Sequence, residues 1–271
     1  MTGPDEDVWT SRRRESQEEA LKASAELSGI FDAVDSWYVD GATRLPRVQL
    51  RSSLHGDDRR TSPYLLSSAV TRNLLVAIDH LHSLRASLFL ADSLQTYAPF
   101  TLIRGSLEGS IHALWLLKPE QRRERISRHI LACRADDRDQ NTMAACLDEP
   151  PAKSRDGWIE SLIKECDLDR DRVKGGVPSF GSIVKKVDKE IWSDGDNLAE
   201  LGWRMCSGMA HGREWSTLDV LYRQLLKEHA DGVAEVRLTA GMTDVSVLTQ
   251  LAYMMLTEAV GLYSNRSAPQ Y

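Results

Sequence analysis

Apolar residues recur at helical spacing along most of the chain, and this pattern predicts an all-α fold. The clearest segment is 62–97, in which an apolar residue returns every three, four or seven positions: Leu66, Val70, Ala77, Leu81, Leu84 and Leu88. Ser62 is an expected N-cap, and Pro63 is an expected first residue of that helix. Other apolar residues flank this stripe, so we expect a central helix packed on several sides.

Breaks in the periodicity divide the chain into an expected main domain and flanking segments. Shorter periodic segments predict further helices at 99–118, 119–147, 157–168, 183–192, 198–211 and 244–263. The predicted fold is an all-α multi-helix bundle with a short β-ribbon near 232–240, where the composition is strand-like. The expected parts are a flexible N-terminal tail (1–14), an N-terminal helical arm (15–40), a loop (41–61), the main helical bundle (62–264) and a C-terminal tail (265–271).

Composition and charge narrow the class of protein. Of 271 residues, 42% are hydrophobic and 27% are charged, which is an ordinary globular balance. The net charge of −6 argues against a surface built throughout for nucleic acid. The basic runs Arg44–Arg60 and Lys118–Arg128 contain interspersed acids and are interpreted as solvated surface. The four cysteines have no metal-like spacing, and no apolar run approaches about 18 residues, so we expect a cytoplasmic protein with no membrane contact.

The segment WRMCSGMAHGREW, residues 203–215, carries the first candidate chemistry. Arg204 and His211 are seven positions apart, which on a helix brings both side chains to within about 20° of one face. An imidazole exchanges protons near neutral pH, and a guanidinium holds a phosphate bidentately. The pair therefore suits cleavage of a phosphodiester without a metal ion, although a structural pair at a helix end or a simple phosphate contact also fits the spacing. Arg122 and His129 share this spacing, but their helix is so rich in charge that we expect it to be solvated.

This spacing resembles the Arg-x(4–6)-His motif of the HEPN superfamily, the higher eukaryotes and prokaryotes nucleotide-binding domains. The resemblance implies a helical, metal-independent endoribonuclease of a toxin or antiphage-defence type. It also implies RNA as substrate, a homodimer that forms one shared site, and an antitoxin protein as a further partner. Arg204 and His211 match the two motif positions, whereas Met205 stands where many members have a polar residue.

A second polar stripe lies on the apolar helix expected at 99–118. Arg104, Glu108 and His112 follow one another at intervals of four, so they share one face. One interpretation is an internal ion pair between Arg104 and Glu108, with His112 satisfied nearby. The other is that Glu108 orients Arg204 or His211, as a supporting carboxylate orients a catalytic imidazole. An Arg-x-x-x-Glu helix followed by a helix ending in His-Gly is also similar to a group of uncharacterised bacterial helical proteins, over about 63–264.

Two other classes of function stay open. The polar stripe could order a dimer or a partner helix in a non-enzymatic interaction protein. Asp79 and His82, with Glu108 and His112, could contribute to a metal-dependent oxidase, but the spacing of the second pair is not that of a di-iron bundle. We therefore expect no metal and no cofactor. The leading prediction is an endoribonuclease with His211 as general acid or base, Arg204 as phosphate clamp, and Glu108, Arg104 and His112 in support.

Overall fold

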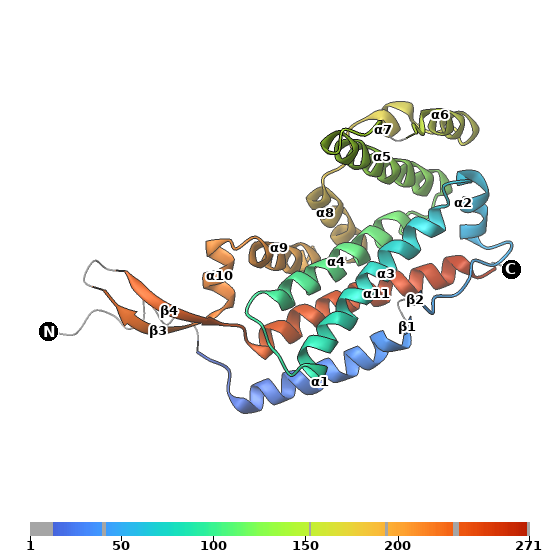
Figure 1. The fold of residues 1–271 in the computed structure, drawn as a ribbon. Coiled ribbons are helices and arrows are strands. Elements are labelled where there is room, and N and C mark those ends of the chain that lie inside the picture. The colour runs from blue at the N-terminus through green and yellow to red at the C-terminus, as the bar shows by residue number, and fades with distance from the viewer. Residues whose placement is uncertain (1–12, 40–41, 152, 193–194, 230–232, 270–271) are drawn as a thin grey trace. The chain divides into compact units, whose positions relative to one another are not determined.

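In a computed structural model of the chain, the predicted all-α fold is confirmed. The structure describes residues 13–39, 42–151, 153–192, 195–229 and 233–269. Its helices within these ranges are α1 (Gln17–Ser36), α2 (Ser53–Thr61), α3 (Leu66–Arg85), a π-helical turn (Ala86–Leu90), α4 (Ala98–Leu117), α5 (Arg122–Cys146), α6 (Asp156–Glu165), α7 (Arg170–Lys174), α8 (Phe180–Ile191), α9 (Leu198–Ala210), α10 (Glu214–Val220) and α11 (Met242–Ser267). The strands are β1 (Tyr38–Val39), β2 (Ala42–Thr43), β3 (Tyr222–Glu228) and β4 (Ala234–Thr239). Figure 1 shows these elements along the chain.

The chain divides into two compact units, and three of the boundaries between them fall inside α3, α4 and α11. The first unit comprises Met1–Arg44, Leu75–Ser110 and Asn197–Thr257, and the second comprises Leu45–Leu74, Ile111–Asp196 and Glu258–Tyr271. Residues 62–264, which the sequence pattern assigns to one bundle domain, are therefore shared between the two units. Of the expected tails, residues 1–12 and 270–271 lie outside the described part of the chain.

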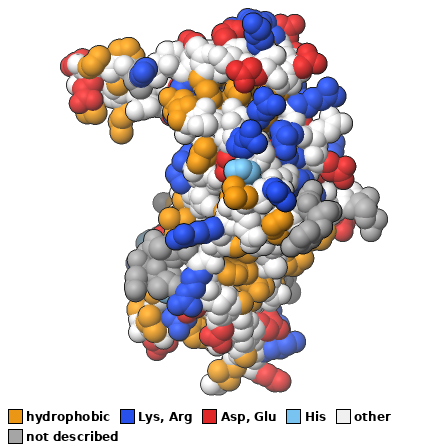
Figure 2. Space-filling view, turned by 90° about the vertical axis from the view of Figure 1, so that its right-hand side faces the viewer, with side chains coloured by type: hydrophobic (Ala, Val, Ile, Leu, Met, Phe, Trp, Pro, Cys, Tyr) orange, Lys and Arg blue, Asp and Glu red, His pale blue; other side chains and the backbone are white. Residues whose placement is uncertain are grey.

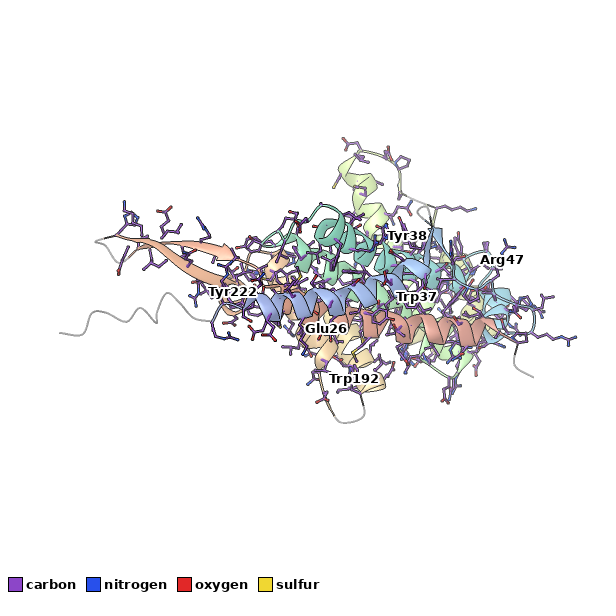
Figure 3. The ribbon with its side chains drawn as sticks, turned by 90° about the horizontal axis from the view of Figure 1, so that it is seen from below. Glu26, Trp37, Tyr38, Arg47, Trp192 and Tyr222 are labelled. Atoms are coloured by element: carbon purple, nitrogen blue, oxygen red, sulfur yellow. The ribbon has the colours of Figure 1, made fainter. Side chains whose placement is uncertain are left out.

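In the first unit, α1 runs beside α3 and α11. The side chain of Glu26 accepts a hydrogen bond from Gln250 of α11 at 3.0 Å, and the ring of Trp37 stacks on Tyr253. Figure 3 shows α1 lying along α11, with Glu26 and Trp37 labelled on it. Buried apolar side chains from α1, α3, α4, α9 and α11 form the core of the unit, including Leu27, Phe31, Leu81, Leu107, Met209 and Ala252.

The predicted β-ribbon is also present in the first unit. β3 and β4 pair antiparallel, with Tyr222 opposite Thr239 and a register irregularity between Leu225 and Lys227. Of the two strands, only β4 has a strand-like composition in the sequence. β3 has the charged sequence YRQLLKE, in which apolar and polar residues do not alternate strictly. The ribbon projects from the helices of this unit (Figure 1).

The second unit has its own apolar cluster, built by α5, α6 and α7. Ile126 and Ile130 of α5 pack against α6 and the segment that follows it. The cluster is completed by Ile159, Leu162, Ile163, Leu168 and Val173. α8 is amphipathic, and it buries Ile183, Val184 and Val187.

The start of the central helix was predicted wrongly. Ser62 is the C-cap of α2, a helix that lies within the expected loop at 41–61. The N-terminus of α3 is capped instead by side chains of α2: Thr61 Oγ1 accepts from the N–H of Leu66 at 3.2 Å, and Asp58 Oδ1 accepts from the N–H of Ser67 at 2.9 Å. The helical path ends at Leu90 rather than Tyr97, and Asp92 then adopts a positive φ of 45°.

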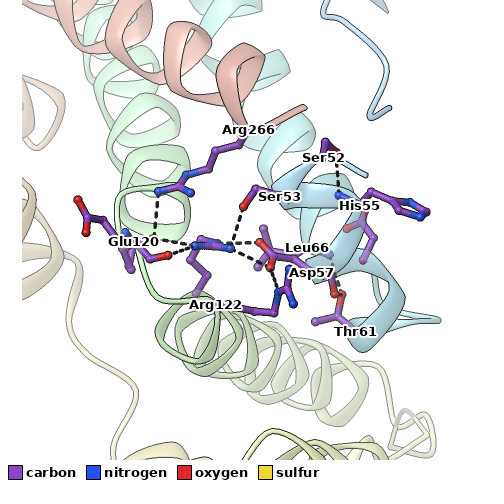
Figure 4. A network of polar contacts seen from close by, with 12 residues as sticks. Ser52, Ser53, His55, Asp57, Thr61, Leu66, Glu120, Arg122 and Arg266 are labelled. Atoms are coloured by element: carbon purple, nitrogen blue, oxygen red, sulfur yellow. Dashed lines mark hydrogen bonds and ion pairs between the residues drawn. The ribbon is translucent and has the colours of Figure 1, made fainter. Parts of the chain in front are cut away.

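Part of the basic run of α5 is buried, so the interpretation of Lys118–Arg128 as solvated surface was wrong for Arg125 and Arg128, whereas Arg122 and Arg123 are exposed. Arg125, Arg128 and His129 are 2%, 3% and 2% exposed. The charges of Arg125 and Arg128 are tolerated inside because each guanidinium is paired with a carboxylate. Arg125 binds both oxygens of the buried Asp57, at 2.7 and 2.9 Å (Figure 4), and Arg128 binds Glu190 at 2.7 Å and the carbonyl of Trp115 at 2.6 Å.

Candidate functional site

α9 buries one face and exposes the other, and this division decides which of its side chains can meet a ligand. Ala199, Gly202, Cys206 and Met209 are buried at helical spacing. At Gly202, α9 packs closely on α11. A Cβ added there would lie only 2.4 Å from Leu251 Cδ2, so the contact requires a glycine or a shift of the leucine side chain. The helix ends at His211, whose N–H donates to the Ser207 carbonyl, and Gly212 follows with φ of 59°.

Arg204 and His211 are both exposed to solvent. The Arg204 side chain is 56% exposed and pairs with Glu200, one turn earlier on α9, at 2.7 Å. His211 is exposed at the end of the helix. Helix geometry separates them by about 10.5 Å along the axis, and among the described residues no hydrogen bond joins the two side chains. A ligand that meets both must therefore extend along the helix.

His211 has a different cationic partner. Arg104 of α4 places Nη1 at 3.2 Å from Nε2 of His211. Because a guanidinium carries donors only, Nε2 is the acceptor in this contact and the ring proton lies on Nδ1. His211 therefore presents a lone pair to Arg104, in the state that a general base requires.

Glu108 fixes the position of Arg104. One carboxylate oxygen, Oε1, accepts from Arg104 Nε at 2.8 Å and from the indole Nε1 of Trp203 at 2.9 Å. The predicted ion pair between Arg104 and Glu108 is thus present. Glu108 is linked to His211 through Arg104. Among the described contacts, no hydrogen bond or ion pair joins Glu108 to Arg204. The sequence pattern does not single out Trp203, since an indole N–H leaves no signal in a hydrophobic pattern.

His112 belongs to the second unit. Its imidazole ring lies 4.9 Å from the ring of Phe180 and 6.5 Å from that of Trp115, measured between centroids. The four residues that the structure brings together are therefore Arg104, Glu108, Trp203 and His211. Arg204 shares α9 with Trp203 and with the C-cap residue His211, and His112 packs against aromatic side chains of its own unit.

Cys206 lies on the buried face of α9 and is no candidate nucleophile. Burial raises the pKa of the Cys206 thiol to about 12, although the Arg104 guanidinium acts in the opposite direction. The thiol is therefore protonated at neutral pH, and its residue is 0% exposed.

The metal alternative finds no ligand cluster among the described residues. His82 pairs with Asp35 at 2.9 Å and stacks on Tyr38, and Asp79 accepts a hydrogen bond from the Tyr38 hydroxyl at 3.2 Å. These contacts join α3 to the end of α1. In the described part of the chain, no three histidine, cysteine, aspartate or glutamate side chains gather in a way that could hold a metal ion.

One helix of the described chain, α11, is long and apolar enough to cross a membrane by length and composition alone. Its most apolar 18-residue window has a mean hydropathy of 1.4, and 50% of that window is buried within the protein. The helix thus also fits a core position, and Val245, Ala252 and Leu256 are 0% exposed.

Comparison of the chain with models of known protein families, with curated proteins and with solved structures found no match.

Proposed function

We propose that this chain is a metal-independent endoribonuclease, with its site at the end of α9. The observation that carries the proposal is the exposed imidazole of His211, placed 3.2 Å from a guanidinium that a carboxylate and an indole hold in place. A second guanidinium, that of the exposed Arg204, lies seven positions before His211 on the same helix. A base beside a guanidinium supplies proton transfer and charge stabilisation, which phosphodiester cleavage uses.

The chemistry follows from these contacts. A phosphate oxygen of bound RNA accepts from Arg104 Nη1 and so releases Nε2 of His211. That nitrogen then takes the proton of a ribose 2′-OH, the 2′ oxygen bonds to phosphorus, and the bond to the 5′ oxygen breaks. The second copy of His211 in the proposed homodimer returns a proton to the leaving 5′ oxygen. Arg204 binds a phosphate further along the strand.

The direct test is cleavage of a single-stranded RNA of mixed sequence in the presence of EDTA. His211→Ala should lower the rate by at least about a hundredfold, which is the usual contribution of a general acid or base. His229→Ala is the matched control, because His229 is another exposed histidine of the first unit, beyond β3. Arg204→Ala has its own control in Arg237→Ala, on the exposed face of β4. A His211→Ala protein that cleaves as fast as the parent overturns the assignment.

A second candidate function is a non-enzymatic interaction protein. It is favoured by large apolar side chains left exposed on α9 and α10: Leu201 at 57%, Trp215 at 49% and Leu198 at 39%. In this case Glu108 and Arg104 order α4 against α9, and their replacement lowers stability or changes the oligomeric mass. One measurement distinguishes the two candidate functions. Only for the nuclease does His211→Ala abolish RNA cleavage while the protein stays folded.

A further inference from the structure

A basic cavity in the second unit has no role in the proposed nuclease. It measures about 620 Å³ and is lined by Arg51, His55, Arg59, Arg60, Arg122 and Glu165, among others. Four guanidiniums against one carboxylate leave a formal charge of +3 on its walls, in a chain whose net charge is −6. In Figure 2, Lys and Arg side chains gather around a histidine on the face shown, which is the right-hand side of Figure 1, where α2 lies.

These arginines come from three different parts of the unit. Arg59 and Arg60 lie in the last turn of α2, where cations also interact favourably with the helix carbonyls. Arg51 precedes the helix, and Arg122 comes from the first turn of α5. The helix end accounts for the first two charges, but it does not explain why two more converge on the same cavity. Like charges gathered in a concave site raise the local concentration of anions.

Arg122 is fixed so that part of it remains available. Its Nε donates to Asp57 at 2.9 Å, while the side chain is still 50% exposed. Asp57 is fully buried and is also bound at both oxygens by Arg125, so this carboxylate is shared between two guanidiniums (Figure 4). The described residues give Arg51, Arg59 and Arg60 no ion-pair partner within the same unit.

Two backbone features shape the cavity at a cost to local stability. Gly56 stands inside α2, where glycine weakens a helix, and a Cβ there would lie 2.3 Å from Arg122 Nη2. The glycine thus lets the guanidinium lie against the helix backbone. Arg51 adopts a φ of 66°, which is uncommon for residues other than glycine, asparagine and aspartate. Strain of this kind concentrates at ligand sites.

From the cavity, its charge and these two features we infer that the second unit binds a polyphosphate chain, as carried by a nucleoside triphosphate or by inorganic polyphosphate. A single phosphate monoester carries only about −1.5 to −2 at pH 7, which is less than the charge on the cavity walls. Guanidiniums bind phosphate oxygens bidentately, and the volume lies within the range of ordinary small-molecule sites. This inference goes beyond the proposed function and does not depend on it.

Calorimetric titration of the full chain with ATP, tripolyphosphate and adenosine tests the inference. We expect ATP and tripolyphosphate to bind, adenosine not to bind, and affinity to fall as salt rises. Equal affinities assign the ligand to the polyphosphate class, whereas tighter ATP binding adds a nucleoside contact; both support the site. Failure of both phosphates to bind overturns it. So does salt-dependent binding confined to a single-stranded RNA oligonucleotide, which indicates a nucleic-acid surface instead.

Matched variants localise the binding. Arg59→Ala with Arg60→Ala should weaken ATP binding at least about tenfold, because two charge-assisted contacts are lost. The control removes Arg138 and Arg170, two exposed arginines of the same unit outside the cavity. Arg51→Gly adds a variant that keeps the fold, since glycine relieves the positive φ while the guanidinium is lost. Unchanged affinity in both cavity variants, or an equal loss in the control, contradicts the inference.

Discussion

At the scale of single residues, the candidate site depends on how firmly Arg104 is held. The guanidinium contacts His211 at one end and Glu108 at the other, so the carboxylate sets where the cation meets the imidazole. Glu108 binds two donors with one oxygen, and hydrogen bonds to a charged acceptor are stronger than neutral ones. In the proposed nuclease, Glu108 is therefore a positioning residue, one contact away from the proposed base, His211.

Glu108→Gln should lower the rate of RNA cleavage about tenfold with little effect on KM, because the neutral amide holds Arg104 less tightly. The measurement is kcat and KM for the full chain, together with thermal unfolding to show that the fold is kept. Glu26→Gln is the control, since Glu26 is also a hydrogen-bond acceptor in the first unit, on the contact between α1 and α11. Equal rates for wild type and Glu108→Gln would remove Glu108 from the account.

His129 gives the second unit a defined dependence on pH. Burial lowers the pKa of His129 to about 4, so the ring is neutral in the folded protein. Its Nε2 donates to the Tyr64 carbonyl at 2.7 Å, and its Nδ1 is buried with no partner among the described residues. A second proton would have to enter at Nδ1, where nothing accepts it.

Because the unfolded chain binds this proton near pH 6.5 and the folded chain only near pH 4, stability should fall as the pH drops through that window. The contribution is about 3 kcal/mol at its full extent, present above pH 6.5 and lost by about pH 4. Urea unfolding at several pH values measures it. His129→Gln keeps a donor for Tyr64 but does not titrate, so its stability should decline less over the same range. Parallel curves for the two proteins would exclude His129 as the cause.

The sequence could predict exposed chemistry on a helix better than buried charge. The spacing of Arg204 and His211 placed them correctly on one helix, and the i, i+4 rule predicted the pair of Arg104 with Glu108. The burial of Arg125, Arg128 and His129 was missed, because charge density indicates a solvated face unless the partners are known. Several of those partners, Asp57, Glu190 and the Tyr64 carbonyl, come from distant parts of the chain.

At the scale of elements, the position of α10 depends on one glycine of α9. A Cβ at Gly208 would lie 2.6 Å from Ser216 and 2.8 Å from Trp215 Cζ2, both of α10. The absence of a side chain therefore allows α10 to fold back against the end of α9, next to His211. The exposed Gly29 of α1 is not needed for packing, because a Cβ added there would have no other atom within 4 Å.

Gly208→Ala should destabilise the protein by about 1–2 kcal/mol, because overpacking outweighs the gain in helix propensity. Gly29→Ala should stabilise it by up to about 1 kcal/mol, since there only the propensity changes. The measurement is the free energy of unfolding in urea. An equal gain in both variants would show that α10 is not packed against Gly208 in solution.

Helix α2 shows why one element escaped the sequence pattern. Among its nine residues, only Leu54 is a buried apolar side chain, so the segment has no stripe that periodicity could detect. Its other buried residues are Asp57 and Thr61, which bind Arg125 and the N-terminus of α3. A helix that is held mainly by polar contacts is not predicted from the spacing of apolar residues.

At the scale of the whole molecule, the proposed nuclease needs two copies of the chain. Leu198 and Leu201 in the first turn of α9 and Trp215 of α10 leave exposed apolar surface on the elements that carry the site, and we propose that a second copy covers it. We expect sedimentation analysis to give twice the single-chain mass of 30.4 kDa. Leu201→Asp should shift the protein toward the single-chain mass and lower RNA cleavage with it. A single-chain mass for the active parent protein would contradict the shared site.

The measurement that tests the central claim most directly is the chemistry of the RNA ends left after cleavage in EDTA. Attack by a ribose 2′-OH predicts a 2′,3′-cyclic phosphate on one fragment and a 5′-OH on the other, and no cleavage where a single 2′-deoxynucleotide replaces the attacking ribose. Mass spectrometry of the fragments from wild type and His211→Ala decides it. Fragments with 5′-phosphate ends, or the same fragments at the same rate from His211→Ala, would contradict the account.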